Sequence, residues 1–256
     1  MRKNYIFIIL CCFMSLPAFS QSWTLKEPYQ LNFKNRHEVS LFAGMASYSG
    51  DLNTVTDENL SYLSEVHTAV GLGYTLNVIN QLSVSLGYFT TKISGDDANY
   101  ADFEHQRRGF SFTNRIHEFA VRFDYEPFQW QNSKFMPYVL GGVGLVTGNA
   151  KTDFESGNYL GRWDSKIEQD IQNKKNTSLS IPLGLGIRYY ATSNVSIKLE
   201  GSFRVGMNDY LDGVSAAGKP SGDSFGTAGL SIVYGFGQAP SKEKVIQVKP
   251  TAPLNQ

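Results

Sequence analysis

Apolar and polar residues alternate with a period of two along much of this chain. In residues 117–126 one face carries His117, Phe119, Val121, Phe123 and Tyr125, and the other carries Glu118, Ala120, Arg122, Asp124 and Glu126. Such alternation predicts a β-strand, because successive side chains of a strand point to opposite faces. The same pattern covers residues 65–77, 82–91, 179–190, 195–204 and 227–236 and, less regularly, residues 38–47 and 135–147. The sequence therefore predicts eight strands.

The connections between these strands alternate in length. Long connections of about 17, 18 and 30 residues, and a last one from Met207 through Asp223, alternate with short turns at 78–80, 126–134 and 192–194. This order predicts an all-β, eight-stranded antiparallel up-and-down barrel with long loops at one end and tight turns at the other. A doubly wound α/β fold is disfavoured, because the connections show no helical periodicity.

The two faces of the predicted strands differ in polarity. The apolar face carries no charge over five or six positions in the cleanest strands. Charged residues gather on the opposite face, interleaved with Gly, Ala and Ser; they are Glu118, Arg122, Asp124, Arg188, Lys198, Glu200 and Arg204. Two kinds of barrel fit this pattern: a soluble, lipocalin-like barrel with an apolar interior, or a transmembrane barrel with an apolar exterior.

The transmembrane barrel explains the charged face better. Eight strands leave a lumen barely wide enough for side chains, and charges of opposite sign can neutralise one another there. We therefore predict that the seven charged residues form a structural polar network in the lumen. Tyr234 and Phe236 suit an interfacial aromatic girdle. In an outer-membrane barrel with an even number of strands, the long loops are extracellular, and the tight turns and both chain ends are periplasmic.

The N-terminus has the layout of a secretory signal peptide. Arg2 and Lys3 precede an apolar stretch at 5–16, and Ala18 and Ser20 place cleavage after residue 20. The apolar stretch is too short for a spanning helix, which needs about 20 residues. We expect a signal peptide at 1–20, a lead-in at 21–36, the barrel at 37–237 and a flexible periplasmic tail at 238–256. Both cysteines, Cys11 and Cys12, belong to the leader.

The composition is compatible with this fold and excludes one class of partner. The chain has 23 Lys+Arg and 23 Asp+Glu, so a nucleic-acid binder, which needs a strongly basic face, is not expected. Removing the two basic residues of the leader leaves 21 basic and 23 acidic residues, a net charge of −2. The 24 Gly, 17 Phe and 14 Tyr suit half-apolar strands.

Candidate chemistry is sparse. Acidic residues near the loops could attract a hard cation, but their spacing matches no EF-hand; they are Asp51, Asp96, Asp97, Asp102, Glu104, Asp209 and Asp212. The histidines His67, His105 and His117 do not converge on a nucleophile in the predicted topology. We therefore predict no catalytic residue, no cofactor and no metal.

Six segments carry a family resemblance. They are LFAGMASYSGDLN (41–53), SGDDANYADFE (94–104), RGFSFTNRIHEFAVRFDY (108–125), PYVLGGVGL (137–145), SIPLGLGIRYY (180–190) and NDYLDGVS (208–215). They resemble the family of small Bacteroidetes outer-membrane barrels that includes PorG, a component of the type IX secretion system. The resemblance implies an outer-membrane location among lipid, the periplasmic ring proteins PorK and PorN as partners, and a structural role in assembling the secretion machinery.

A second function fits the long loops. Residues 147–175 do not reproduce the Pro-rich and Gly-rich third loop of close members of that family. The alternative is a surface barrel whose long loops bind an extracellular ligand or support adhesion. Passive diffusion through the lumen is disfavoured by the width of eight strands.

Overall fold

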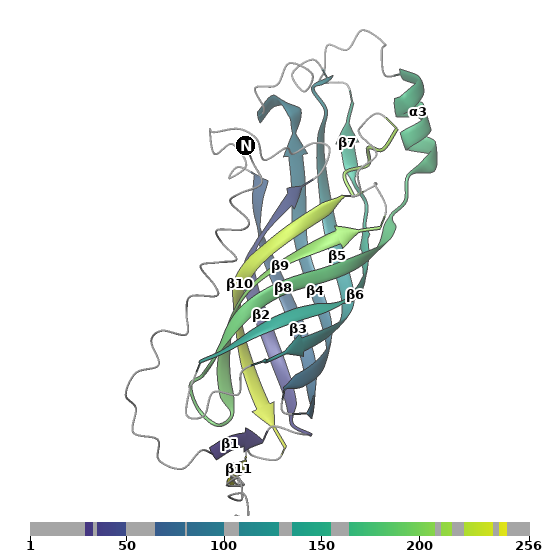
Figure 1. The fold of residues 1–256 in the computed structure, drawn as a ribbon. Helices are drawn as coiled ribbons and strands as arrows, with labels where there is room; N and C mark the ends of the chain where they lie inside the picture. The colour runs from purple at the N-terminus through teal and green to yellow at the C-terminus, as the bar shows by residue number, and fades with distance from the viewer. Residues whose placement is uncertain are drawn as a thin grey trace, which may run out of the picture.

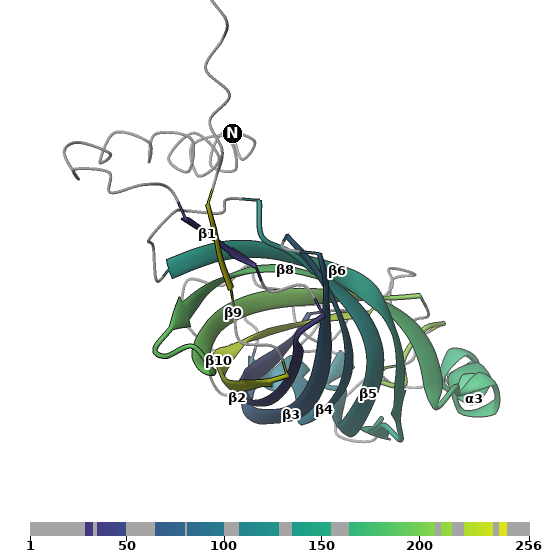
Figure 2. The same ribbon diagram turned by 90° about the horizontal axis from the view of Figure 1, so that it is seen from below.

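The computed structural model describes residues 29–32, 35–49, 65–79, 81–99, 108–127, 135–154, 164–207, 211–216, 223–237 and 241–244. The predicted signal peptide at 1–20 and most of the lead-in and tail lie outside these residues. Eight long strands surround one lumen (Figures 1 and 2). They are β2 (His37–Ser49), β3 (Val66–Ile79), β4 (Leu82–Asp96), β5 (Ser111–Tyr125), β6 (Phe135–Gly148), β8 (Thr177–Tyr190), β9 (Val195–Gly206) and β10 (Ser224–Phe236).

These strands form a closed antiparallel barrel. Each pairs with the next long strand in the chain, and β10 pairs with β2 from Ser224↔Ser49 to Phe236↔His37. The short turn after β8 is fixed locally, because the Thr192 hydroxyl accepts hydrogen bonds from the amides of Asn194 and Val195. The structure thus confirms the predicted eight-stranded, antiparallel up-and-down barrel.

A broad apolar belt covers the exterior. Leu72, Leu86 and Ile232 are each 61% exposed, and outward-facing side chains of the other strands continue the belt around the barrel. Ten residues of a strand tilted by about 40° rise about 25 Å, which is the height of the apolar band of an outer-membrane barrel. Charged residues face inward at the same level, so the polarity is that of a membrane-spanning barrel.

Aromatic rings lie at both edges of the belt. At the tight-turn edge, Phe135 packs on Tyr189 with 4.9 Å between ring centroids, and His37 stacks on Phe236 at 5.8 Å. At the loop-side edge, Tyr88 packs on Phe119 at 5.0 Å. Aromatic side chains at such positions suit the boundary between lipid and water.

The strands extend further toward the loops than the sequence predicted. β4 continues to Asp96 and β5 begins at Ser111, although alternation suggested only 82–91 and 117–126. In these extensions the polarity of the two faces is inverted: Ile93 is buried inside, while Lys92 and Arg115 are exposed outside. The loop end of the barrel therefore has the polarity of a soluble protein and stands beyond the apolar belt.

An apolar cluster, which we call the upper core, fills this loop end. Its members are Ala46, Tyr48, Ala69, Phe89, Ile93, Phe110, Phe112, Ile116, Val146, Ile167, Leu211, Val214 and Phe225. The rings of Tyr48 and Phe112 meet edge to face at 4.8 Å. Because these side chains come from six of the eight barrel strands and from the connections, they close the lumen at this end.

The third long connection contains regular structure. Strand β7 (Lys151–Asp153) extends the sheet beside β5, and helix α3 (Asp164–Asn173) buries Ile167 in the upper core. This helix corrects the prediction that no connection is helical. Its only other apolar residue, Ile171, is exposed, so its apolar pattern is too weak to recognise, and tertiary packing holds it. A short 3-10 helix, η3 (Asp97–Asn99), follows β4.

Parts of the two terminal segments pair with each other. Strand β1 (Tyr29–Asn32) is antiparallel to β11 (Ser241–Lys244), with Tyr29 opposite Lys244. This two-stranded ribbon lies beyond the tight-turn end of the barrel (Figure 1). The sequence suggested a lead-in and a flexible tail at these positions and did not predict that they pair. Among the described residues, no helix is long and apolar enough to cross a membrane.

Candidate functional site: the charged lumen

The structure places all seven charged residues of the predicted network inside the barrel. Glu118, Arg122 and Asp124 come from β5, Arg188 comes from β8, and Lys198, Glu200 and Arg204 come from β9. Alternation explains this, because all seven lie on the face opposite the apolar belt. They are joined by ion pairs at three levels along the barrel axis.

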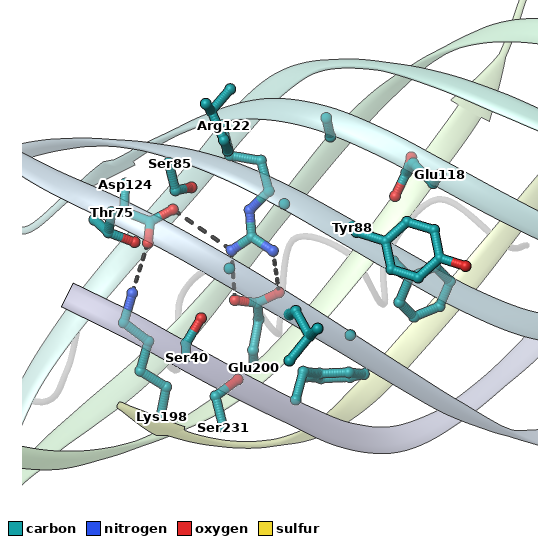
Figure 3. A pocket seen from close by; sticks show the side chains of 18 of the residues that line it. Ser40, Thr75, Ser85, Tyr88, Glu118, Arg122, Asp124, Lys198, Glu200 and Ser231 are labelled. Carbon is teal, nitrogen blue, oxygen red and sulfur yellow. Dashed lines mark hydrogen bonds and ion pairs between the residues drawn. The ribbon is translucent and has the colours of Figure 1, made fainter. Parts of the chain in front are cut away.

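The central level holds four of these residues. Two guanidinium nitrogens of Arg122 donate to the two carboxylate oxygens of Glu200 at 3.1 and 2.7 Å. The Lys198 ammonium donates to Asp124 at 2.7 Å, and Arg122 lies 3.5 Å from the other oxygen of Asp124. Figure 3 shows these side chains reaching toward one another across the lumen. The Tyr138 hydroxyl also donates to Glu200, at 3.0 Å.

On the loop side, Glu118 and Arg204 form a separate pair. Arg204 Nε donates to Glu118 Oε2 at 2.8 Å, and their side chains are only 4% and 2% exposed. The Ser180 hydroxyl donates to the other oxygen of Glu118 at 2.7 Å. The guanidinium also lies over the Phe89 ring, 4.7 Å from its centroid. This pair therefore joins the charged lumen to the upper core.

On the turn side, the network includes residues that sequence reasoning missed. Arg188 donates to Glu38 Oε1 at 2.6 Å, and Arg36 lies 3.7 Å from the same oxygen. Glu126 lies 3.7 Å from Arg188, and burial raises the pKa of its carboxyl above the ordinary value despite that guanidinium. The alternation of side chains along residues 38–47 could have placed Glu38 inside the barrel, but apolar and polar residues alternate poorly in that stretch. Arg36 lies in the predicted lead-in, where nothing distinguished it.

Little free volume remains among these side chains. A cavity of about 70 Å³ lies beside the central level, where hydroxyls of Ser40, Ser85 and Ser231 face the charged groups (Figure 3). A space of this size holds a few water molecules, because the centre of one water molecule needs about 10–15 Å³. Between the upper core and the turn-side pairs, the lumen is thus filled by side chains.

Among the described residues, the candidate catalytic and metal residues do not converge on one site. His67 bonds to Ser94, and His117 bonds to the Tyr88 hydroxyl. Asp97 accepts two hydrogen bonds from Arg108 at 2.8 Å. Within the part of the chain that the structure describes, no group of three potential ligands is placed to hold a metal ion. His105, Asp51, Asp102, Glu104 and Asp209 lie outside the described residues.

A family model covers most of this fold. The model for the domain of unknown function DUF6089 matches residues 28–242, which include every barrel strand. The chain belongs to the DUF6089 family. No curated protein matches this chain in sequence.

Several solved structures resemble the DUF6089 chain in fold. Neisserial surface protein A is 13% identical, with 78% of this chain and 97% of that chain covered and a TM-score of 0.49. Ail of Yersinia pestis is 12% identical, with 79% and 99% covered and a TM-score of 0.42. OprG of Pseudomonas aeruginosa is 12% identical, with 78% and 97% covered and a TM-score of 0.39. The likeness is confined to the fold.

A buried tyrosine fastens the last long connection to the barrel. The Tyr48 hydroxyl lies within hydrogen-bonding distance of the Asp212 carboxylate, at 2.8 Å, and of the Asp223 carboxylate. Asp223 also accepts the Leu211 amide, and Asp212 accepts the Val214 amide. These bonds hold residues 211–216 at the loop end, where Leu211 and Val214 are part of the upper core.

Removing this hydroxyl is expected to loosen the loop end. Tyr48→Phe leaves two buried carboxylates without one donor, which costs about 1–3 kcal/mol of unfolding free energy. Limited proteolysis should then cleave the 207–223 connection faster than in the wild type. Tyr74→Phe is the matched control, because the Tyr74 hydroxyl bonds to His37 at an exposed site. Equal protease sensitivity of both variants would contradict the fastening role.

Proposed function

We propose that this protein is a non-enzymatic outer-membrane barrel that serves as a structural subunit of a PorG-like type IX secretion machinery. In this proposal lipid surrounds the apolar belt, and periplasmic ring proteins of the PorK and PorN kind bind at the tight-turn end. The signal peptide predicted at 1–20 supplies export, and the resemblance of the six quoted segments supports the secretion role.

The filled lumen is the observation that carries this proposal. Ion pairs occupy three levels of the lumen, and the upper core closes the loop end. Among the described residues, side chains thus occupy the route that a solute would take through the lumen. Its lipid-facing wall and its two ends remain available to bind other molecules. Such a barrel suits the role of an anchor or an assembly platform.

The charged lumen residues also support a non-enzymatic role. Each of the five lumen carboxylates lies within salt-bridge distance of a cation of the barrel itself; they are Glu38, Glu118, Asp124, Glu126 and Glu200. Groups engaged in this way stabilise one another and are poorly placed to transfer protons to a substrate. Hydrolytic assays with esters, peptides and lipids should therefore give no activity above that of an unrelated barrel.

The ribbon of β1 and β11 supports a contact on the tight-turn side. It gives the chain an ordered element beyond the barrel, where a periplasmic partner could bind. Truncation after Gly237 removes β11 and should abolish co-purification of ring proteins from detergent-solubilised membranes. The barrel should keep its heat-modifiable migration on a denaturing gel. Recovery of no ring protein with the full chain, together with normal secretion in a deletion strain, would contradict the secretion role.

The loop end supports a second candidate function, recognition of an extracellular ligand or adhesion. The upper core, β7 and α3 build an ordered platform beyond the belt. The double variant Glu168→Lys/Ile171→Asp changes exposed positions of α3 only. Loss of adhesion in this variant with intact secretion would favour the binding function, and the reverse pattern with the Gly237 truncation would favour the secretion role.

A further inference from the structure

Two cations lie side by side on the outer wall, just beyond the loop-side edge of the apolar belt. The pairing of β4 with β5 places Tyr88 opposite Phe119, then Thr90 opposite His117, then Lys92 opposite Arg115. All six face outward, and both Lys92 and Arg115 are exposed. An aromatic row is therefore followed, two rows higher on the same face, by a row of two positive charges.

This juxtaposition is unfavourable unless an anion binds there. Like charges directly opposite each other destabilise a pair of strands. Within the described residues, neither Lys92 nor Arg115 forms a salt bridge. Lys151 of β7 adds a third exposed cation, because it pairs with Thr113, two residues from Arg115 on the same face. Two outward-facing acids of the described residues, Asp96 and Asp153, lie further up, past these cations.

An apolar groove lies below the two cations, on the other side of the row formed by Thr90 and His117. It has a volume of about 680 Å³ and runs across β3, β4, β5, β6 and β8 on the outer wall. Leu86, Tyr88, Phe119, Val121, Val143 and Leu145 are among the side chains that line it. Tyr88 and Phe119 thus belong both to the groove and to the aromatic row below the charged row.

We propose that this wall binds a phosphate-bearing lipid of the loop-side leaflet, with acyl chains in the groove and the phosphate against Lys92 and Arg115. The inference rests on the proposed outer-membrane location, which puts the groove in lipid and the cations at headgroup level. Four residues from Tyr88 to Lys92 span about 13 Å along the strand, and long cationic side chains at such a depth reach a headgroup. Guanidinium and ammonium groups bind phosphate through charge-assisted hydrogen bonds.

The test is lipid binding by the purified full chain in detergent, measured by native mass spectrometry. The probes are diphosphorylated lipid A, the same lipid with its phosphates removed, and inorganic phosphate. We expect the wild type to bind the phosphorylated lipid roughly 30-fold more tightly than the dephosphorylated one, the factor for two basic residues at an anionic membrane surface. Inorganic phosphate at equal concentration should not compete, because it leaves the groove empty.

Two variants separate the cations from the groove. Lys92→Gln/Arg115→Gln should lose the preference for phosphate, whereas Lys166→Gln/Lys175→Gln, with the same change in net charge at exposed loop-end positions, should keep it. Val121→Trp, in the middle of the groove, should weaken binding of both lipids alike. Equal binding of both lipids by the wild type, or an unchanged preference in Lys92→Gln/Arg115→Gln, would overturn the inference.

Folding is followed in the same samples by heat-modifiable migration. A barrel that folds and inserts into vesicles but ignores the phosphates overturns the lipid site and leaves the outer-membrane proposal intact. A chain that folds but does not insert overturns both.

Discussion

Replacing Glu118 by alanine is expected to lower the free energy of unfolding of the barrel by about 3–5 kcal/mol, because it leaves an uncompensated buried charge. Among the described residues, Arg204 forms a salt bridge with Glu118 and with no other carboxylate, and the two side chains are almost fully buried. Ser180 would also lose its acceptor. Urea unfolding of the barrel in detergent or vesicles measures the change.

A double variant separates the contribution of the two charges from the contribution of side-chain packing. Glu118→Leu/Arg204→Met replaces both charges by apolar side chains of similar volume and is expected to recover most of the loss, since a buried ion pair often contributes little against such a replacement. An unfolding free energy for Glu118→Ala within about 0.5 kcal/mol of the wild type would mean that water screens this pair and that the lumen is not filled, because ordinary surface substitutions fall in that range.

Replacing Gly44 by leucine is expected to prevent proper closure of the barrel and to cost about 3 kcal/mol or more. Gly44 lies on β2 opposite Gly229 of β10, at the seam between the first and last barrel strands. A Cβ at Gly44 would lie 2.3 Å from the Ala228 carbonyl oxygen and 2.7 Å from the Gly229 Cα, both backbone atoms that cannot turn away. Loss of heat-modifiable migration and a lower urea midpoint would report the defect.

Gly201 provides the matched control. A Cβ built there meets no atom within 4 Å, so Gly201→Leu is expected to fold like the wild type. If both leucine variants migrate and unfold alike, the β2–β10 seam is not closed as described, and the barrel would have to be open at that edge.

The faces of the strands were predictable because they depend only on period-two alternation. Arg188 and Lys198 could be assigned to the lumen without any knowledge of pairing. Their partners could not be assigned, because the residues that meet across the lumen depend on the stagger between strands. Glu118 and Arg204 are 86 positions apart, and Arg188 and Glu38 are 150 apart.

The loop end was harder to predict for a different physical reason. The alternation continues through Ile93 and Ile116, but the side that is apolar changes where the barrel leaves the belt. A strand predicted from one uninterrupted apolar face therefore stops short of its loop-side end. Helix α3 depends on two distant contacts, the burial of Ile167 in the upper core and the hydrogen bond that Asp170 accepts from the Ala216 amide. The ribbon depends on pairing between residues more than 200 positions apart, so neither element leaves a local signal.

The most direct test of this account is the environment of the outer wall of β5. Both cysteines of the chain lie at positions 11 and 12, in the predicted leader, so single cysteines can be introduced at 113, 115, 119, 121 and 123 of the mature chain and spin-labelled. In vesicles, we expect labels at 119, 121 and 123 to be accessible to oxygen and shielded from a water-soluble nickel complex. Labels at 113 and 115 should show the opposite preference. Access of the nickel complex to all five positions would contradict a lipid-facing belt.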